Sequence, residues 1–334
     1  MTDLPSDRVH EVRELRPDDG PALAAAFDAA FTAVDPTHES RGLEAWRRRY
    51  LENPAGLRAV VALAADGSVL AQYAGLPQRA RVGGETALVT QAVDSFCLPS
   101  ARALGRRGAF TRAGEHFAEL YCGEGGDRWV WGLPVPAARR VGERTLRYRP
   151  FGPRPLLELR GTPRGAAPAL TVDEVPWEAI AELEGALEAL QDWLAGEAGA
   201  FALRDPAALR WRYGEGGYRL LVAREGSGAV VGYAVLGSGP FEGREGLVWC
   251  DGIAPADAEL ALLHRAAQEA SRQGEPALLV QVPPWWPGFL RLQEQGLRVL
   301  PGRWPWAGRS FDPERPRAWW EAHWFHTAGD TDLC

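Results

Sequence analysis

The order of hydrophobic and polar positions predicts alternating strands and helices at the start of the chain. Residues 9–16 alternate apolar and polar side chains, as a half-buried strand does. Over 21–33 the apolar residues recur every three or four positions, which is typical of a helix that packs on a core. A second helix is expected over 43–50, because Asn53-Pro54 follows it and such a dipeptide ends helices.

A series of strands is predicted next. Apolar segments 57–64 and 68–76 flank the dipeptide Asp66-Gly67, and this combination is one of the strongest sequence signals for a β-hairpin. The elements expected after it are a third antiparallel strand over 86–98, a helix over 102–120 and a tryptophan-rich strand over 128–133.

The second half of the chain repeats this pattern. A segment that ends at Tyr213 is followed by two apolar runs around Gly226-Ser227-Gly228 and by a third run, as in the first half. The aligned pairs are Tyr50 with Tyr213, Tyr73 with Tyr233, and Asp94 with Asp251. A period of about 160 residues has the scale of a domain and not of a solenoid repeat, so we predict an internal duplication. Chance similarity of two strand-turn-strand units is the alternative.

A domain boundary is expected in residues 152–169, which are rich in proline and glycine. The sequence thus predicts an N-terminal domain over 1–151, a linker over 152–169 and a C-terminal domain over 170–334. Each domain is expected to be of the α/β class, with a mixed, mainly antiparallel sheet flanked by helices. The length of 334 residues fits two domains of this kind.

Composition argues against several classes of function. The formal net charge is −7, so long-range attraction to a nucleic-acid backbone or an anionic membrane is absent, and neither partner is expected. All 37 basic residues are arginine, which excludes a lysine-based covalent mechanism. No segment reaches the roughly 18 apolar residues of a membrane span, and the N-terminal residues lack a secretory signal pattern.

The cysteine and histidine spacings do not indicate a metal site or a disulfide framework. The four cysteines contain no CxxC pair, so a reducing, cytoplasmic location is expected. His323 and His326 precede Asp330 and Asp332, but this spacing matches no standard site, and no metal is expected.

The segment best suited to chemistry begins at Asp94 and continues through a turn rich in glycine and arginine between Arg102 and Thr111. A turn of this kind at a helix start presents backbone N–H groups and the positive end of the helix dipole, which can hold a pyrophosphate without lysine. Gly-Lys-Ser/Thr and GxGxxG are both absent, so the turn is neither a P-loop nor a dinucleotide-binding loop. A solvated arginine face on an ordinary helix start is the alternative.

This order of elements resembles the GNAT superfamily of acyl-CoA-dependent N-acyltransferases. The resemblance covers 9–150, including Gly132-Leu133-Pro134, and recurs more weakly over 170–300. It implies two tandem GNAT-like domains, the second degenerate, and acetyl-CoA or another acyl-CoA as co-substrate. In that family a bulge separates the fourth strand from the fifth, pantetheine pairs with the edge so exposed, and a turn of pattern Arg/Gln-x-x-Gly-x-Gly/Ala binds the pyrophosphate.

Carried over to this sequence, the turn falls on residues 105–110, with Gly108 as its central glycine. Gly105 stands where the family usually has Arg or Gln, and Phe110 stands where a small residue is commoner. The cofactor-binding residues that the resemblance implies are Phe96, Cys97, Leu98, Arg102, Gly105, Arg106, Arg107, Gly108 and Ala109.

The implied reaction is attack of a primary amine on a thioester, which needs a base, an amide donor for the thioester oxygen and an acid near the leaving sulfur. Asp94 is the candidate base or amine-orienting carboxylate. Its counterpart Asp251 lies in a copy that lacks the Gly/Arg turn, so a structural role for both aspartates stays open. The tyrosine acid usual in the family has no equivalent over 136–142.

Three functions follow from the resemblance. The first is an N-acetyltransferase that acts on a small-molecule or peptide amine, the second a catalytically silent protein that binds an acyl-CoA or a partner, and the third an aminoacyl or peptidyl transferase on the same double fold. Turnover separates the first from the second, and the third needs a basic groove for nucleic acid. The acceptor, the acyl length and the oligomeric state are left open.

Overall fold

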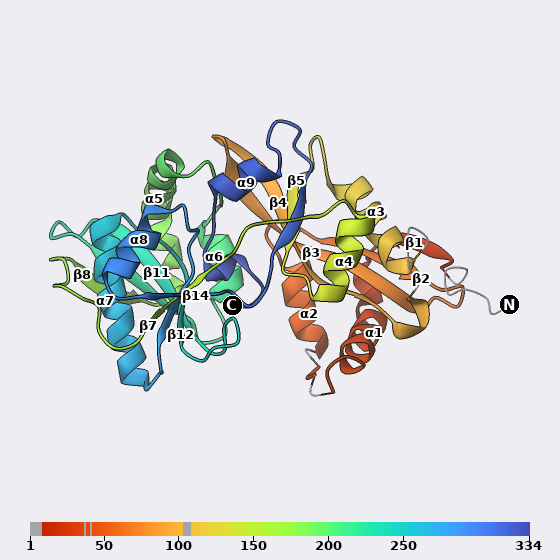
Figure 1. The fold of residues 1–334 in the computed structure, drawn as a ribbon, viewed down its shortest axis with the longest axis horizontal. Helices are drawn as coiled ribbons and strands as arrows, with labels where there is room; N and C mark the ends of the chain where they lie inside the picture. Colours follow the sequence, from red (N-terminus) through yellow and green to blue (C-terminus); the bar gives the residue numbers. More distant parts are fainter. Residues whose placement is uncertain (1–8, 37, 41, 103–107) are drawn as a thin grey trace. The chain divides into compact units, whose positions relative to one another are not determined.

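The chain forms two compact units, and each has its own sheet (Figure 1). The computed structural model describes residues 9–36, 38–40, 42–102 and 108–334. Unit 1 comprises Met1–Arg79, Ala87–Phe151 and Trp306–Ala318, and unit 2 comprises Ala80–Thr86, Gly152–Pro305 and Trp319–Cys334.

Unit 1 is built on a mixed sheet with the strand order β1-β2-β3-β4-β5-β15-β6. Its strands are β1 (Glu11–Glu14), β2 (Arg58–Leu63), β3 (Val69–Val82), β4 (Glu85–Cys97), β5 (Asp127–Gly132), β15 (Ala307–Ser310) and β6 (Arg149–Pro150). Its helices are η2 (Pro17–Asp19), α1 (Gly20–Thr32), α2 (Gly42–Leu51), η3 (Pro99–Ala101), α3 (Ala109–Tyr121) and α4 (Pro136–Thr145). β4 and β5 run parallel, whereas β1–β2, β2–β3 and β5–β15 are antiparallel.

The β2–β3 hairpin forms where its sequence signal predicts it. The carboxylate of Asp66 accepts hydrogen bonds from the backbone N–H and the hydroxyl of Ser68 (3.0 and 2.7 Å). Gly67 has a φ of 82°, which glycine adopts without strain. Both strands are buried over most of their length, and α3 packs against β2.

Unit 2 has the strand order β14-β7-β13-β12-β11-β10-β8. Its strands are β7 (Leu156–Leu159), β8 (Thr171–Val175), β10 (Arg219–Arg224), β11 (Val230–Ser238), β12 (Leu247–Ile253), β13 (Leu278–Val280) and β14 (Arg298–Leu300). Its helices are η4 (Trp177–Leu183), α5 (Glu184–Glu197), α6 (Pro206–Tyr213), α7 (Ala256–Gln273), α8 (Pro287–Glu294) and η5 (Ala328–Asp330), and α9 (Arg317–His323) leads into it. A short strand β9 (Ala200–Ala202) pairs with Ala80–Val82 at the end of β3 and with β16 (Trp324–Phe325).

The two sheet orders match strand for strand, which confirms the predicted duplication. β8, β10, β11, β12 and β13 take the places of β1 to β5, and the parallel pair recurs as β12 and β13. The crossover helix α7 likewise corresponds to α3, and the helix after the fifth strand, α8, corresponds to α4. The predicted fold, two tandem mixed sheets flanked by helices, is therefore present.

One strand of each sheet comes from a distant part of the sequence. β7 follows β6 of unit 1 along the chain, but it lies between β13 and β14 in the sheet of unit 2. β15 follows β14 of unit 2, but it lies between β5 and β6 in the sheet of unit 1. The segment 152–169, expected to be a linker, thus contains a buried strand, and 306–318 belong to unit 1.

The helix expected over 102–120 begins later than its pattern suggested. Pro99–Ala101 form the 3-10 turn η3, and Arg102 after it is extended, with φ −69° and ψ 110°. α3 starts at Ala109, with Gly108 at its N-cap. The extended backbone of Arg102 lies outside the helix, which residue spacing alone does not reveal.

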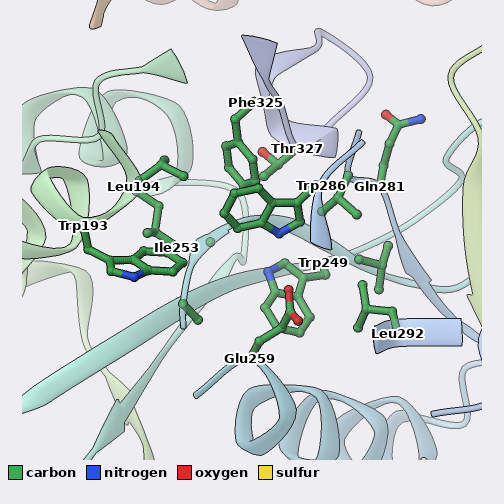
Figure 2. A pocket seen from close by; sticks show the side chains of 14 residues that line it. Trp193, Leu194, Trp249, Ile253, Glu259, Gln281, Trp286, Leu292, Phe325 and Thr327 are labelled. Atoms are coloured by element: carbon green, nitrogen blue, oxygen red, sulfur yellow. The ribbon is translucent and has the colours of Figure 1, made fainter. Parts of the chain in front are cut away.

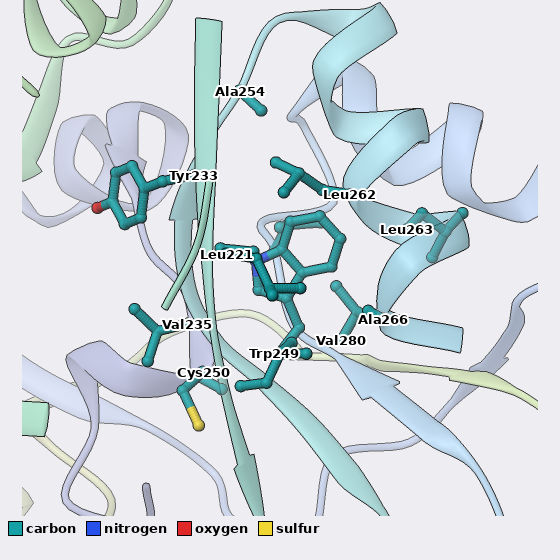
Figure 3. Close-up of a cluster of buried hydrophobic side chains, with 14 of the residues drawn as sticks. Leu221, Tyr233, Val235, Trp249, Cys250, Ala254, Leu262, Leu263, Ala266 and Val280 are labelled. Atoms are coloured by element: carbon teal, nitrogen blue, oxygen red, sulfur yellow. The ribbon is translucent and has the colours of Figure 1, made fainter. Parts of the chain in front are cut away.

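The core of unit 2 lies on both faces of its sheet, and one layer of it is covered by α7. Trp249 of β12 points toward Leu262 and Ala266 of α7, while Cys250, the next residue of the strand, points to the other face (Figure 3). The small residues of α7 let the helix pack closely on the sheet and enclose the indole, which is 7% exposed.

Candidate active site

The parallel strands of unit 1 diverge at their carboxyl ends. Their register runs from Leu88 opposite Asp127 to Ala92 opposite Gly132. Two residues further on, Asp94 has a φ of 48°, a left-handed conformation that is uncommon for a residue other than glycine. β4 continues past this bulge to Cys97, so residues 96–98 lie beyond the last pair with β5, where the resemblance implies an open edge.

The backbone of Cys97 faces this open edge. The N–H of Leu98 donates to the carbonyl of Leu70 on β3 (2.9 Å), and successive peptide groups of a strand point in opposite directions. The N–H and C=O of Cys97 therefore point away from β3. Arg102 donates to this carbonyl through Nε at 3.4 Å, a long hydrogen bond that an incoming amide could replace.

Side chains around the edge fix its shape. Phe96 is buried, and its ring meets Phe27 of α1 edge to face, with 5.9 Å between centroids. Burial raises the pKa of the Cys97 thiol, although the backbone N–H of Phe110 opposes the shift. The thiol therefore stays protonated near neutral pH and is no nucleophile.

The N-terminus of α3 adjoins the same edge. The Phe110 N–H lies against the Cys97 sulfur, and Gly108 provides no side chain to cap the first turn. The backbone N–H groups of a first helical turn, together with the positive end of the helix dipole, are suited to a phosphate. Ala109 is buried, whereas Arg102 is exposed beside the turn. Gly105, Arg106 and Arg107 lie outside the described residues.

Asp94 is held by two neighbours from α2. Its carboxylate accepts a hydrogen bond from the hydroxyl of Tyr50 (2.8 Å) and lies 3.0 Å from Nε of Arg49. The side chain of Gln72 on β3 donates to the Asp94 backbone carbonyl (2.9 Å) and so braces the bulge. The Asp94 side chain is only 6% exposed, and these contacts hold it in place at the bulge.

Unit 2 repeats this arrangement at Asp251. The carboxylate of Asp251 accepts from the hydroxyl of Tyr213 (3.3 Å) and from Nε of Arg204 (2.7 Å). Arg204 also binds Asp330 of η5 (2.7 Å). The C-terminal turn thus packs on the Asp251 cluster, so this copy of the cluster is buried by its own chain.

A small cavity of about 30 Å³ adjoins the Asp94 bulge, and that volume is enough for a water or an ammonium group. It lies between α1, α2 and the ends of β3 and β4, where Phe27, Trp46 and Asp94 line it. Asp28 lines it as well, and Oδ1 of Asp28 is 3.2 Å from Nε2 of His38. Sequence reasoning missed this Asp28–His38 pair. The one sequence signal for this pair is the helical spacing on α1, which places Asp28 near the face of Leu23 and Phe27.

The corresponding divergence in unit 2 is filled. The register of β12 against β13 ends with Trp249 opposite Val280, and beyond it a cavity of about 30 Å³ remains among Trp193, Trp249 and Trp286 (Figure 2). Glu259 lies in the first turn of α7, where a phosphate would bind in unit 1, and pairs with Arg291 at 2.9 Å. Burial raises the pKa of Glu259, and a carboxylate at this position disfavours a phosphate.

Comparison with known proteins gives matches among solved structures alone. No family model and no curated protein matches the sequence. A GCN5-related N-acetyltransferase from Anabaena variabilis aligns with a TM-score of 0.65 at 15% identity, over 90% of this chain and 72% of the other. A GCN5-related N-acetyltransferase from Kribbella flavida gives 0.64 at 13%, over 90% and 71%. A conserved protein of Enterococcus faecalis, named a probable N-acyltransferase, gives 0.63 at 14%, over 90% and 73%.

The chain has the GNAT fold. The alignments span both units, in agreement with the duplicated sheet order. In this GNAT fold the bulge at Asp94, the edge at Cys97 and the start of α3 lie together, whereas the turn over 105–107 is not described. α4 carries no tyrosine, and Tyr148 after it pairs through its hydroxyl with Tyr73.

Two general properties complete the description of the GNAT-like units. Within the described ranges, no three His, Cys, Asp or Glu side chains come together as a metal site would require. No described helix is both long and apolar enough to cross a membrane.

Proposed function

We propose that this chain is an N-acyltransferase that moves an acetyl or other acyl group from an acyl-CoA to a primary amine. The observation that carries the proposal is the open edge at Cys97 beside the uncapped first turn of α3. An extended amide chain can add to that edge as a strand would, while the turn receives a diphosphate.

The residues proposed to hold the co-substrate follow from this geometry. The backbone of Cys97, with Phe96 and Leu98 on either side, pairs with the pantetheine amides. Gly108 and Ala109 begin the helix whose N–H groups face the pyrophosphate, and Arg102 lies close enough to leave the Cys97 carbonyl and bind a phosphate. Gly105, Arg106 and Arg107 are proposed to complete the turn.

The amine is proposed to enter from the cavity beside Asp94. Asp28 and Asp94 supply negative charge there, and the rings of Phe27 and Trp46 supply apolar and cation–π surface. The carboxylate of Asp94 already accepts a hydrogen bond from Tyr50 and forms an ion pair with Arg49, so we assign Asp94 to orienting the amine. The Asp28–His38 pair, with side chains 32% and 14% exposed, is the better placed to take the proton.

The proposed transfer forms one C–N bond and breaks one C–S bond. The neutral amine nitrogen attacks the thioester carbonyl carbon, the C–S bond breaks, and the CoA sulfur leaves with the electron pair and takes up a proton. The chain provides amine orientation, a proton acceptor and the N–H groups of the β4 edge. The protein is proposed to work in the cytoplasm, where its four cysteines, which form no disulfide, stay reduced.

Calorimetric titration with acetyl-CoA and with a longer acyl-CoA tests the cofactor site. Gly108→Glu puts a negative side chain at the proposed phosphate turn, where φ of −65° accommodates glutamate, so affinity should fall by about tenfold or more. Gly226→Glu, in an exposed turn with open space around the glycine, is the matched control and should bind like the parent. No binding by the parent protein would exclude the transferase.

Turnover separates the enzyme from a silent acyl-CoA binder. The repeated Asp–Tyr–Arg cluster at Asp251, where no cofactor is expected, favours the silent alternative. CoA thiol release should be measured with a panel of amines for the parent, Asp28→Asn and Asp94→Asn. For an enzyme, we expect Asp28→Asn to lower kcat by about 10²-fold, as loss of a general base does, and Asp94→Asn mainly to raise KM. Binding without thiol release for every amine would instead establish the silent protein.

A further inference from the structure

Unit 1 contains a second and larger cavity, of about 390 Å³, at the end of α3 remote from the proposed cofactor site. It lies between the second half of α3, β5, β15 and the segment after α4. The residues that line it are Gly114, Glu115, Phe117, Ala118, Glu119, Cys122, Val130, Thr145, Leu146, Arg147, Tyr148, Arg309 and Phe311. A cavity of this size is large enough for a small organic molecule.

Two arginines bring positive charge to this cavity. Arg309 of β15 lies over the ring of Phe311, 4.2 Å from its centroid, and burial, together with the charge of Arg147, lowers the pKa of Arg309. Among the described residues, no carboxylate forms an ion pair with either guanidinium. Like charges held near each other without a counter-charge are stabilised by an anion between them.

Arg147 occupies a backbone position that favours glycine. It follows the C-terminus of α4 with a φ of 62°, and the N–H of Tyr148 donates back to the carbonyl of Gly142 (3.0 Å), as in a left-handed helix cap. An arginine is strained in this conformation, and such strain is concentrated at functional sites. Stability alone would favour glycine at position 147. The chain instead has an arginine there, and this arginine lines the cavity.

The other titratable groups of the cavity do not supply the missing anion. Burial raises the pKa of both Cys122 and Tyr148, so each stays neutral. Glu119 pairs with His116 of its own helix (3.4 Å), and Glu115 lies on α3, across the cavity from β15. Phe117, Phe311 and Leu146 give the interior an apolar character.

We propose that this cavity binds a small organic anion, with its carboxylate or phosphate between Arg147 and Arg309 and its apolar body on Phe117 and Phe311. The site is separate from the cofactor edge, and its ligand is neither the acyl-CoA nor the amine of the proposed reaction. The two arginines fix the charge of the ligand, and the two rings fix its apolar part.

Calorimetry with phenylacetate, phenyl phosphate and inorganic phosphate tests the site. We expect saturable binding of at least one of the two aromatic anions, with inorganic phosphate binding more weakly because it cannot pack on the rings. Whichever aromatic anion binds more tightly identifies the preferred oxyanion. Arg309→Gln and Arg147→Gly should each weaken that binding by about tenfold or more. Arg144→Gln, at an exposed arginine in the last turn of α4, is the control and should leave it unchanged.

Arg147→Gly separates binding from folding. Because glycine suits the left-handed cap, this variant should unfold at the same temperature as the parent or higher, even though it binds the anion less. Its acetyl-CoA titration should match that of the parent, so failure here is distinct from failure of the proposed function. The proposal is overturned if the parent binds neither aromatic anion at millimolar concentration, if inorganic phosphate binds best, or if Arg147→Gly binds like the parent.

Discussion

The buried side chain of His326, 3% exposed, gives the stability of this protein a defined pH dependence. Burial, together with the charges of Arg154 and Arg204, lowers the pKa of His326 from 6.5 to about 3. Between these values the unfolded chain binds a proton at this imidazole and the folded chain does not. The free energy of unfolding should therefore fall by roughly 1 kcal/mol for each pH unit as the pH decreases from 6.5 toward 3.

Urea unfolding at a series of pH values measures this contribution. His326→Gln cannot titrate, so its stability should fall less steeply over the same range, whatever its stability at neutral pH. His10→Gln, at an exposed histidine, should keep the slope of the parent. Equal slopes for the parent and His326→Gln would contradict the prediction.

Individual site residues were predictable where the duplication repeats them. Aligning the two halves paired Tyr50 with Tyr213 and Asp94 with Asp251, and the structure gives both pairs the same hydroxyl-to-carboxylate hydrogen bond. The arginines could not be found this way. Arg49 lies on α2 beside its tyrosine, whereas Arg204 precedes α6, so equivalent charges come from positions that do not align.

Among the elements, the C-terminal turn η5 packs against β12 and the Asp251 cluster of unit 2. A Cβ at Gly329 would lie 1.8 Å from the Tyr213 hydroxyl and 2.7 Å from the Cys250 carbonyl oxygen. Because the second of these is backbone, the turn must shift, and its Asp330 would move away from Arg204. Gly329→Ala should therefore lower the free energy of unfolding by about 1–3 kcal/mol, as overpacking does.

Denaturant unfolding of Gly329→Ala beside Gly226→Ala checks the fit of this turn. Gly226 has open space around its Cβ position, so its alanine variant should stay within about 0.5 kcal/mol of the parent. If Gly329→Ala were as stable as the control, the prediction would be wrong, because η5 would then accommodate the methyl group without loss of stability.

Elements with strong local signals were predictable, and those fixed by distant partners were not. The Asp66-Gly67 hairpin follows from its own sequence. The short strands β9, β15 and β16 carry no period of their own, because their pairing is decided by edges far away in the chain. For the same reason β7 was hidden in a segment whose prolines and glycines indicate a linker.

In the molecule as a whole, sequence comparison revealed the duplication but not the exchange of β7 and β15. Two copies of one fold explain the matching sheet orders. The repeat of about 160 residues, however, does not show which unit's sheet a given strand joins. The predicted domains 1–151 and 170–334, taken alone, would therefore each lack a strand that lies between two others in its sheet, β15 and β7 respectively.

A fragment of residues 9–151 therefore lacks β15, which lies between β5 and β6. Without β15, one edge of β5 is unpaired. Trp129 and Trp131 also lose their contact with Trp306, whose ring centroid lies 6.0 and 5.9 Å from their ring centroids. Unpaired apolar edges drive association, so we expect this fragment to aggregate in size-exclusion chromatography. Attaching residues 306–318 through a flexible linker should restore a monomer with a cooperative thermal transition, and a scrambled version of the same residues should not. A bare fragment that is monomeric and melts cooperatively would show that the sheet closes without its exchanged strand.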